Sequence, residues 1–239
     1  MKTKAALLIC ILGFLFLDTA WSMGLRSFVA LPINKGGAVL RLQHESNQDT
    51  NARVAILNAA YGISATQAIF FGQPYRLEPK GSDRLRDTSI LYRYTASQQD
   101  TSWGTKRLGL LAGVVVPTDG GRDSAIQAGL VSTVFSGRHE LDFDVLYQAG
   151  TGERLDSGRY DLSWQYRLIP KQYQDWGIGK ELHGVIDLGG RWTEGGTTVH
   201  QVTMGLQWVN PSWVLEAGVF QDINGLKQTH ALVSLRIHI

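Results

Sequence analysis

The sequence predicts an all-β fold, a transmembrane antiparallel up-and-down β-barrel of about 12 strands that follows a cleaved N-terminal signal peptide. Three observations lead to this prediction. A short basic and apolar segment opens the chain, alternating apolar and polar residues fill the remainder, and the last segment stays apolar on one face to its final residue. They divide the chain into a signal peptide (1–22), an N-terminal periplasmic segment (23–37) and one outer-membrane barrel (38–239).

Residues 1–22 have the layout of a secretory signal peptide. Two lysines precede the apolar run Ala5–Leu17, and Ala20-Trp21-Ser22 follows with small residues at the positions that a signal peptidase reads. A membrane-spanning helix would need roughly 20 apolar residues. We therefore expect cleavage after Ser22, which removes Cys10, the only cysteine, and leaves no disulfide or thiolate site.

From residue 38 onward, apolar residues recur at every second position in segments separated by Gly, Asp, Asn and Pro clusters. A helix would need apolar residues at three- and four-residue spacing. Each segment is close to the length, about 9–11 residues, with which a tilted strand crosses a bilayer. The predicted strands are 38–45, 53–61, 65–74, 87–95, 106–116, 125–135, 139–149, 159–169, 182–193, 198–209, 212–222 and 229–239.

The connections support a barrel whose two termini lie at the same end. Short inner turns should alternate with longer outer loops. Gly62-Ile63-Ser64 and Asn210-Pro211-Ser212 are short and fall on the inner side, whereas the predicted inner connections 96–105 and 170–181 are long. The clearest hairpin joins the strands on either side of Glu153-Arg154. A loop centred there predicts three cross-strand pairs, Phe143 with Trp164, Glu140 with Arg167 and Gln148 with Arg159.

Alternation alone does not say which face is inside, because a soluble all-β sandwich alternates too. The signal peptide, the last strand and the placement of aromatic residues favour a membrane barrel. Ala231, Val233, Leu235, Ile237 and Ile239 share one face of the last strand. The aromatic residues of the apolar face, many of them near strand ends as in membrane barrels, are Tyr92, Tyr94, Tyr147, Tyr160, Trp164, Tyr166, Trp192, Trp208 and Trp213.

If the apolar face meets lipid, the polar face lines a lumen. An arginine or lysine on the lipid face at the bilayer midplane costs about 2–4 kcal/mol. The predicted lumen-lining residues are Arg41, Arg93, Arg107, Glu140, Asp142, Asp144, Arg159, Asp161, Arg167, Asp187, Arg191, Glu216 and Arg236. Among them, Glu140, Asp142 and Asp144 form an acidic stripe beside an arginine-bearing strand, which predicts a transverse field across a passage.

The sequence predicts no catalytic residue, no metal site and no cofactor. The six histidines lack the spacing of metal ligands, and no G-x-S-x-G elbow or phosphate-binding glycine loop occurs. Ser234 and His238 share a face but lie about 13 Å apart along a strand, too far for a nucleophile and its base. Removal of the signal peptide lowers the formal net charge from +2 to +1, which argues against nucleic acid as a partner.

Three segments carry a family resemblance. Leu85–Tyr94, with Asp87 and Leu91, resembles the "G-x-x-D-x-x-L-x-x-K-Y-R" strand of an outer-membrane family associated with the meta-pathway of phenol degradation. Tyr61–Tyr75 resembles its "Y-G" turn followed by a strand that ends in "P-Y". Leu108–Thr118 resembles its glycine-rich strand ending in "P-T-G", with Asp119 in place of the last glycine. The resemblance spans roughly residues 53–239, and it implies a transporter or channel without catalytic residues.

We therefore expect a channel or uptake protein of the bacterial outer membrane that passes small solutes, hydrophobic or aromatic ones if the resemblance holds. The expected partners are outer-membrane lipid, the solute, and the barrel-assembly machinery, which would read the C-terminal strand. Three alternatives stay open at this point. They are a structural or ligand-binding barrel without transport, a barrel-type outer-membrane hydrolase, and a soluble exported β domain.

Overall fold

The computed structural model of the chain describes residues 24–27, 30, 33–81, 83–172 and 179–239. The predicted signal peptide lies outside these ranges. Within them, no helix is long and apolar enough to cross a membrane. Every regular element of the described chain is a β-strand, as the two-residue period predicts.

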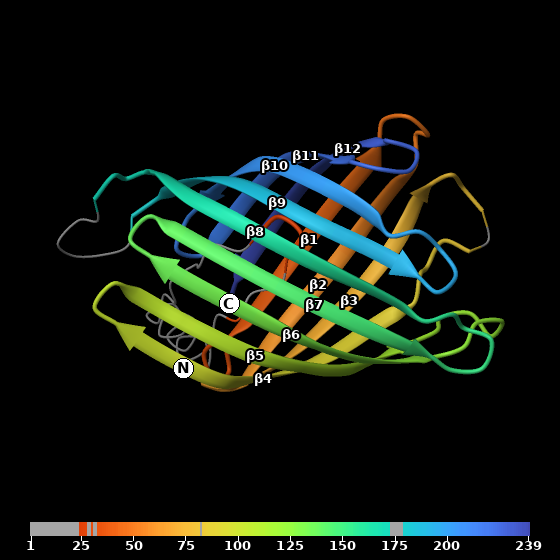
Figure 1. The fold of residues 1–239 in the computed structure, drawn as a ribbon, viewed down its shortest axis with the longest axis horizontal. Coiled ribbons are helices and arrows are strands. Elements are labelled where there is room, and N and C mark those ends of the chain that lie inside the picture. The colour runs from red at the N-terminus through yellow and green to blue at the C-terminus, as the bar shows by residue number, and fades with distance from the viewer. Residues whose placement is uncertain (1–23, 28–29, 31–32, 82, 173–178) are drawn as a thin grey trace, which may run out of the picture.

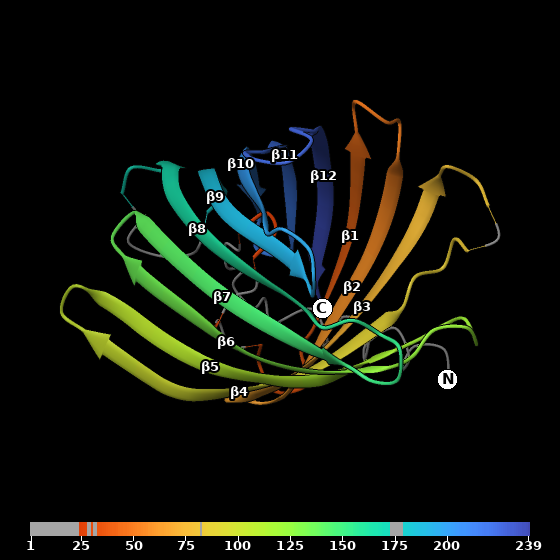
Figure 2. The ribbon, with the colours of Figure 1, turned by 45° about the vertical axis from the view of Figure 1, so that its right-hand side comes forward.

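The strands close into one antiparallel barrel (Figures 1 and 2). They are β1 (Ala38–Asn47), β2 (Arg53–Ser64), β3 (Gln67–Glu78), β4 (Thr88–Thr101), β5 (Gly104–Val116), β6 (Ala125–Ser136), β7 (His139–Gly150), β8 (Ser157–Ile169), β9 (Glu181–Thr193), β10 (Val199–Val209), β11 (Trp213–Asp222) and β12 (Thr229–His238). Each strand pairs with its neighbour in sequence, and β12 pairs with β1 from Val39–His238 to Asn47–His230. The predicted twelve-stranded up-and-down barrel is confirmed.

Both ends of the chain's barrel portion lie at one rim, here the inner end, where β1 begins and β12 finishes. Most connections at this end are short, as expected. The predicted long inner connection at 96–105 is wrong, because β4 continues to Thr101 and β5 already starts at Gly104. Residues 96–101 are exposed on both faces of the strand, so water solvates both faces and the two-residue apolar period is lost there. The connection between Ile169 and Glu181 remains long.

The register of β7 against β8 differs from the prediction by two residues. The observed partners of Glu140, Phe143 and Gln148 are Gln165, Leu162 and Ser157, where the prediction had Arg167, Trp164 and Arg159. The loop turns through Gly152, whose φ of 58° is a left-handed conformation that favours glycine. The turn therefore sits ahead of Glu153-Arg154. A slip of two residues keeps every side chain on its predicted face.

The two faces of the barrel wall differ sharply in polarity. In β12, Leu235 is 42% exposed on the outside, whereas its neighbour Arg236 is completely buried inside. The outward face of the other strands is likewise leucine, isoleucine, valine and aromatic residues, including Tyr92, Trp164 and Trp208. An apolar outer band around a polar interior is the arrangement of transmembrane barrels, and it is the reverse of a soluble sandwich.

The described residues 24–27 and 30 of the N-terminal segment lie inside the barrel. Residues 23–37 were predicted as an N-terminal periplasmic segment, and within it Leu25 and Ala30 are completely buried among inward-facing side chains of the strands. The described part of the segment, in red in Figures 1 and 2, runs within the ring of strands. This segment has no two-residue alternation of apolar and polar residues, so its sequence does not indicate which side chains face inward. Its position depends on contacts that form only in the folded barrel.

Candidate functional site

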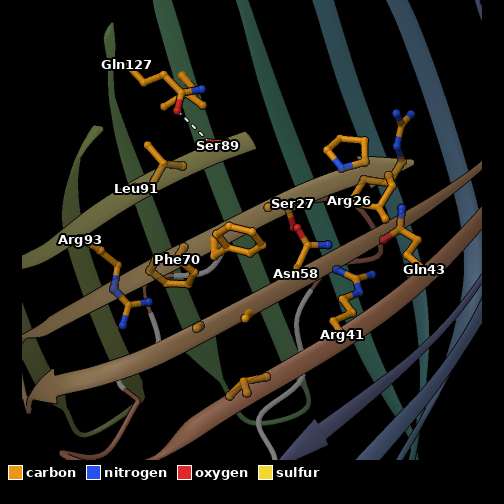
Figure 3. A pocket seen from close by; sticks show the side chains of 18 of the residues that line it. Arg26, Ser27, Arg41, Gln43, Asn58, Phe70, Ser89, Leu91, Arg93 and Gln127 are labelled. Atoms are coloured by element: carbon orange, nitrogen blue, oxygen red, sulfur yellow. Dashed lines mark hydrogen bonds between the residues drawn. The ribbon is translucent and has the colours of Figure 1, made fainter. Parts of the chain in front are cut away.

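A cavity of about 710 Å³ lies in the lumen beside the N-terminal segment. Asp87, Gln148 and Ser157 line it near the outer loops, and Ala38 and Ile239 line it at the inner end. Its wall comes mainly from β1 to β4, with further side chains from β6 to β9 and β12. Figure 3 shows this cavity from close by. Because residues of both ends line one continuous space, the cavity follows the barrel axis over most of the barrel height.

Five of the predicted lumen residues line the cavity, and all five are arginines. They are Arg41, Arg93, Arg159, Arg191 and Arg236. The predicted carboxylates are buried in the interior and do not line it, namely Glu140, Asp142, Asp144, Asp161, Asp187 and Glu216. The remaining two, Arg107 and Arg167, lie near the inner end, where their Nε atoms donate to the Gln98 side chain and to the Pro170 carbonyl.

A first network of charges joins β1, β11 and β12. Arg41 and Arg236 stand directly opposite each other in the register, and each donates to one oxygen of Glu216 at 2.7 Å. The Ser234 hydroxyl donates to the same carboxylate and accepts from Arg41 Nε at 3.2 Å. Two like charges opposite each other destabilise a sheet. The shared carboxylate offsets that repulsion and holds both guanidinium groups toward the cavity.

A second network joins β7, β8 and β9, and in it a carboxylate again contacts two arginines. Arg159 donates to Asp161 at 2.8 Å and to Asp144 at 3.1 Å, and Arg191 donates to the other oxygen of Asp161 at 2.8 Å. Asp144 and Asp161 are register partners, so two carboxylates stand opposite each other. Charge-assisted hydrogen bonds of this length are the strong class of side-chain hydrogen bond. They position Arg159 and Arg191 at the cavity surface.

The acidic stripe does not face the passage. Glu140, Asp142 and Asp144 are at most 4% exposed, and the Asp142 carboxylate accepts from Thr133 at 2.6 Å and from Gln165 at 2.7 Å. Both oxygens of the buried Asp142 carboxylate are thus hydrogen-bonded by side chains of the wall, as buried polar groups require. The predicted acidic stripe therefore lies within the packed wall and does not line the cavity.

Apolar side chains share the cavity surface with the arginines. Phe70, Leu91 and Leu146 line it, and the Arg93 guanidinium stacks 5.1 Å from the centre of the Phe70 ring (Figure 3). Leu91 and Leu146 are absent from the predicted lumen residues, because that prediction took only the charged residues of the polar face. Leu91 is two residues from Arg93, and Leu146 is two residues from Asp144, so each shares a strand face with a predicted lumen residue. This alternation could have identified both leucines.

Arg26 lines the cavity from the N-terminal segment and is also absent from the predicted lumen residues. Its guanidinium donates to Gln201 at 2.5 Å, lies 3.7 Å from Glu45 and stacks 4.2 Å over the Phe220 ring. No periodic pattern marks this residue, so the sequence carries no signal for it. With Arg26 included, six arginines and two carboxylates, Glu45 and Asp87, line the described cavity.

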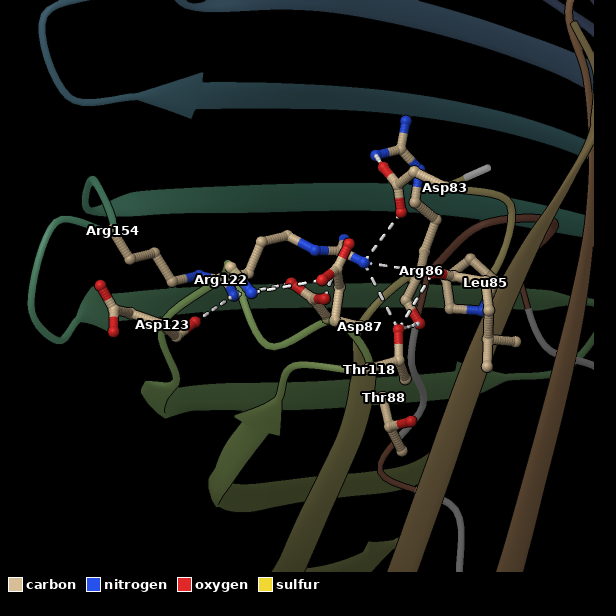
Figure 4. A network of polar contacts seen from close by, with 12 residues as sticks. Asp83, Leu85, Arg86, Asp87, Thr88, Thr118, Arg122, Asp123 and Arg154 are labelled. Atoms are coloured by element: carbon tan, nitrogen blue, oxygen red, sulfur yellow. Dashed lines mark hydrogen bonds and ion pairs between the residues drawn. The ribbon is translucent and has the colours of Figure 1, made fainter. Parts of the chain in front are cut away.

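Ion pairs between three outer loops surround Asp87 at the outer mouth (Figure 4). Arg122 contacts Asp83 at 3.0 Å and Asp87 at 2.9 Å, and Arg154 contacts Asp87 at 2.7 Å. In the third loop, hydrogen bonds from the Tyr147 hydroxyl and the Gly150 amide hold the pKa of the Asp156 carboxyl below its usual value. The loops after β3, β5 and β7 are thus tied together beside the cavity.

Two observations bear on metal and acid–base chemistry in the described residues. The described part of the chain has no group of three or more His, Cys, Asp or Glu side chains that could hold a metal ion. Glu181 and His183 form a buried pair at 2.6 Å in β9, but neither lines the cavity. The arrangement presents guanidinium donors and apolar surface to a solute, which suits binding and passage.

No protein-family model matches the chain, and no curated protein matches it. Several solved outer-membrane structures match its fold. The KdgM porin in complex with disordered oligogalacturonate (9% identity) and the NanC porin (9%) superpose with TM-scores of 0.57 and 0.54, each match covering 83% of this chain and 98% of the other.

An outer membrane channel from Pseudomonas putida F1 superposes with a TM-score of 0.55 at 14% identity. This match covers 91% of the present chain and 100% of the Pseudomonas chain. Identities this low establish the shared fold alone. The resemblance to the phenol-degradation family stays a prediction, and the chain has the twelve-stranded barrel fold of bacterial outer-membrane porins and channels.

Proposed function

We propose that this protein is a channel or uptake protein of the bacterial outer membrane that passes small solutes through the arginine-lined cavity. The observation that carries the proposal is the cavity itself, which is lined by residues from the outer mouth to the inner end of a barrel with an apolar exterior. Twelve strands make a barrel wider than the eight whose side chains fill the interior, and narrower than the 16–18 of open porins. A narrow path for small molecules fits this size.

The lining favours solutes that carry both a negative charge and an apolar part. Six arginines and two carboxylates face the described cavity, and guanidinium groups bind carboxylates and similar anions with paired hydrogen bonds. Phe70 and Leu91 add apolar contact surface beside Arg93. Aromatic carboxylates and phenolates combine the two features, and the family resemblance in residues 53–239 agrees with aromatic solutes.

Reversal potentials in planar bilayers, together with benzoate flux into liposomes, test this proposal. We expect a small conductance with anion preference and measurable benzoate entry. Arg191→Gln should weaken the anion preference, because Asp161 keeps its 2.8 Å contact with Arg159 while one cavity-facing charge is lost. Lys106→Gln is the matched control, since this exposed side chain lies outside the lumen against Trp103.

Equal reversal potentials for the native protein and Arg191→Gln would refute the arginine-lined route. Absence of both conductance and benzoate entry would refute transport. A barrel that binds a ligand without passing it, or a barrel hydrolase, would then be the better explanation.

A further inference from the structure

A second hollow lies on the outside of the barrel wall, across β8, β9 and β10. It is a groove of about 300 Å³ that shares no lining residue with the lumen cavity. Its larger apolar side chains are 38–54% exposed and belong to the outward band, namely Trp164, Leu168, Ile186 and Met204. The groove therefore opens toward lipid, and the proposed transport does not account for it.

Gly184 leaves the groove open. It faces outward on β9 and is the register partner of Tyr166. A Cβ atom at Gly184 would meet only Leu168 Cδ1 within 4 Å among the described residues, at 3.7 Å. At Gly190, on the same face of β9, the Tyr160 ring already occupies this space, since a Cβ atom there would meet Cε1 of the ring at 2.3 Å. The groove is thus an outward glycine that neighbouring side chains leave uncovered.

Arg138 borders the groove at the inner end of the barrel. It belongs to the turn between β6 and β7, and its guanidinium stacks 4.5 Å from the centre of the Tyr166 ring. Its Nε donates to the Arg167 carbonyl at 2.8 Å and its Nη2 donates to the Leu168 carbonyl at 3.0 Å. Tyr166 and Leu168 also line the groove, so these contacts fix a positive charge beside its apolar surface.

The charge of Arg138 has no carboxylate partner among the described residues. Its two hydrogen bonds use Nε and Nη2, so the Nη1 group is available to an acceptor outside the chain. An arginine side chain stays charged in proteins, and its planar guanidinium matches the oxygens of a phosphate. The groove therefore combines an apolar trough with an anion-binding group.

The aromatic side chains around Arg138 place it at the boundary of the membrane. Trp164 Nε1 donates to His139 Nδ1 at 3.2 Å, and the His139 ring lies 4.9 Å from the Tyr166 ring. Aromatic residues of this kind form belts at the level of the lipid headgroups. This end of the barrel carries most of the short turns, which lie on the periplasmic side of outer-membrane barrels. Arg138 is therefore level with the phosphates of the inner leaflet.

We propose that the groove is a binding site for one anionic phospholipid of the inner leaflet, phosphatidylglycerol in the simplest case. An acyl chain lies over Gly184 between Trp164 and Met204, and the phosphate accepts from Arg138. A net negative headgroup is preferred, because basic groups at the membrane boundary attract anionic lipid. The site lies outside the lumen and does not depend on the proposed channel function.

Native mass spectrometry of the full-length chain in detergent tests the headgroup contact. With equal amounts of dioleoyl phosphatidylglycerol and dioleoyl phosphatidylcholine, the first lipid retained should be phosphatidylglycerol by several-fold. Arg138→Gln should abolish this preference and Arg138→Lys should keep it. Lys106→Gln is the matched control, because Lys106 stacks on Trp103 at the same end of the barrel but outside the groove. Equal retention of the two lipids, or an unchanged preference in Arg138→Gln, would overturn the proposal.

Filling the groove tests the acyl-chain contact. Gly184→Leu should lower phosphatidylglycerol retention several-fold, whereas Ala112→Leu, which enlarges an exposed outward residue of β5, should not. Heat-modifiable migration verifies that both variants fold.

Tryptophan quenching by a brominated acyl chain gives a second measurement in the unsubstituted barrel. Brominated phosphatidylglycerol should quench more emission than brominated phosphatidylcholine, and Trp164→Phe should remove the excess. Equal lipid retention in Gly184→Leu and Ala112→Leu, or an excess that survives in Trp164→Phe, would overturn the site. A dimer without bound lipid would also overturn it and would assign the groove to a second copy of the chain.

Discussion

Two pairs of arginines in the barrel interior are each bridged by one carboxylate. The register places Arg41 opposite Arg236 and Arg159 opposite Arg191, so like charges would repel across both pairs. Glu216 of β11 bridges the first pair, and Asp161, on the same strand as Arg159, bridges the second. In both networks a negative charge therefore lies between two positive charges. The carboxylate holds the guanidinium groups in place at the cavity.

Glu216→Gln should destabilise the barrel strongly. It preserves the side-chain shape but leaves Arg41 and Arg236 without the negative charge between them, and breaking a buried pair in this way costs about 3–5 kcal/mol. The measurement is urea unfolding in lipid vesicles. Glu45→Gln is the control, because its 3.7 Å contact with Arg26 is partly exposed and should contribute less than about 1 kcal/mol. Similar losses of unfolding free energy in Glu216→Gln and Glu45→Gln would contradict a stabilising role for the Glu216 network.

At the scale of the strand, alternation sets which side chains meet lipid. β12 shows this most simply, since Leu235 and Ile237 are exposed outside while Ser234 and Arg236 are buried inside. The same strand closes the barrel against β1 and pairs with β11. Its outward residues therefore serve both membrane insertion and closure.

Leu235→Arg should block or slow assembly, because an arginine on the lipid face costs about 2–4 kcal/mol near the midplane. Leu235→Ile keeps the apolar face and the strand propensity and should assemble normally. Heat-modifiable gel migration of membrane fractions measures the folded share. Normal folding of the arginine variant would show that this face does not meet lipid.

The whole molecule is a closed ring of hydrogen-bonded strands with one segment inside it. Closure through β1 and β12 leaves no sheet edge, which is what a spanning structure needs where water cannot satisfy backbone groups. The described residues 24–27 and 30 occupy part of the lumen inside this ring.

The mature protein should begin near Met23 and be recovered in the outer-membrane fraction. Removal of residues 1–22 would place the new N-terminus next to Gly24, the first described residue of the segment inside the barrel. N-terminal sequencing and migration of unheated against heated samples check this, with the unheated barrel migrating faster. An intact Met1 in a cytosolic fraction would refute the export route.

The strands and their faces were predictable because each depends on local sequence. The two-residue period of β12, for example, appears directly in Ala231–Ile239, and lipid on one side requires it. The register of β7 against β8 was missed by two residues, since a slip of two keeps both faces and only the backbone geometry at Gly152 decides between the alternatives.

By itself the sequence determined a membrane barrel with charge inside, because strand period and the cost of charge in lipid act on each residue separately. Only the tertiary structure decided that Arg159 and Arg191 face the cavity while Asp144 is buried behind them, and that Leu25 fills a notch between Gly205 and Gly218. These outcomes depend on packing between strands far apart in the chain, and on a segment without a period of its own.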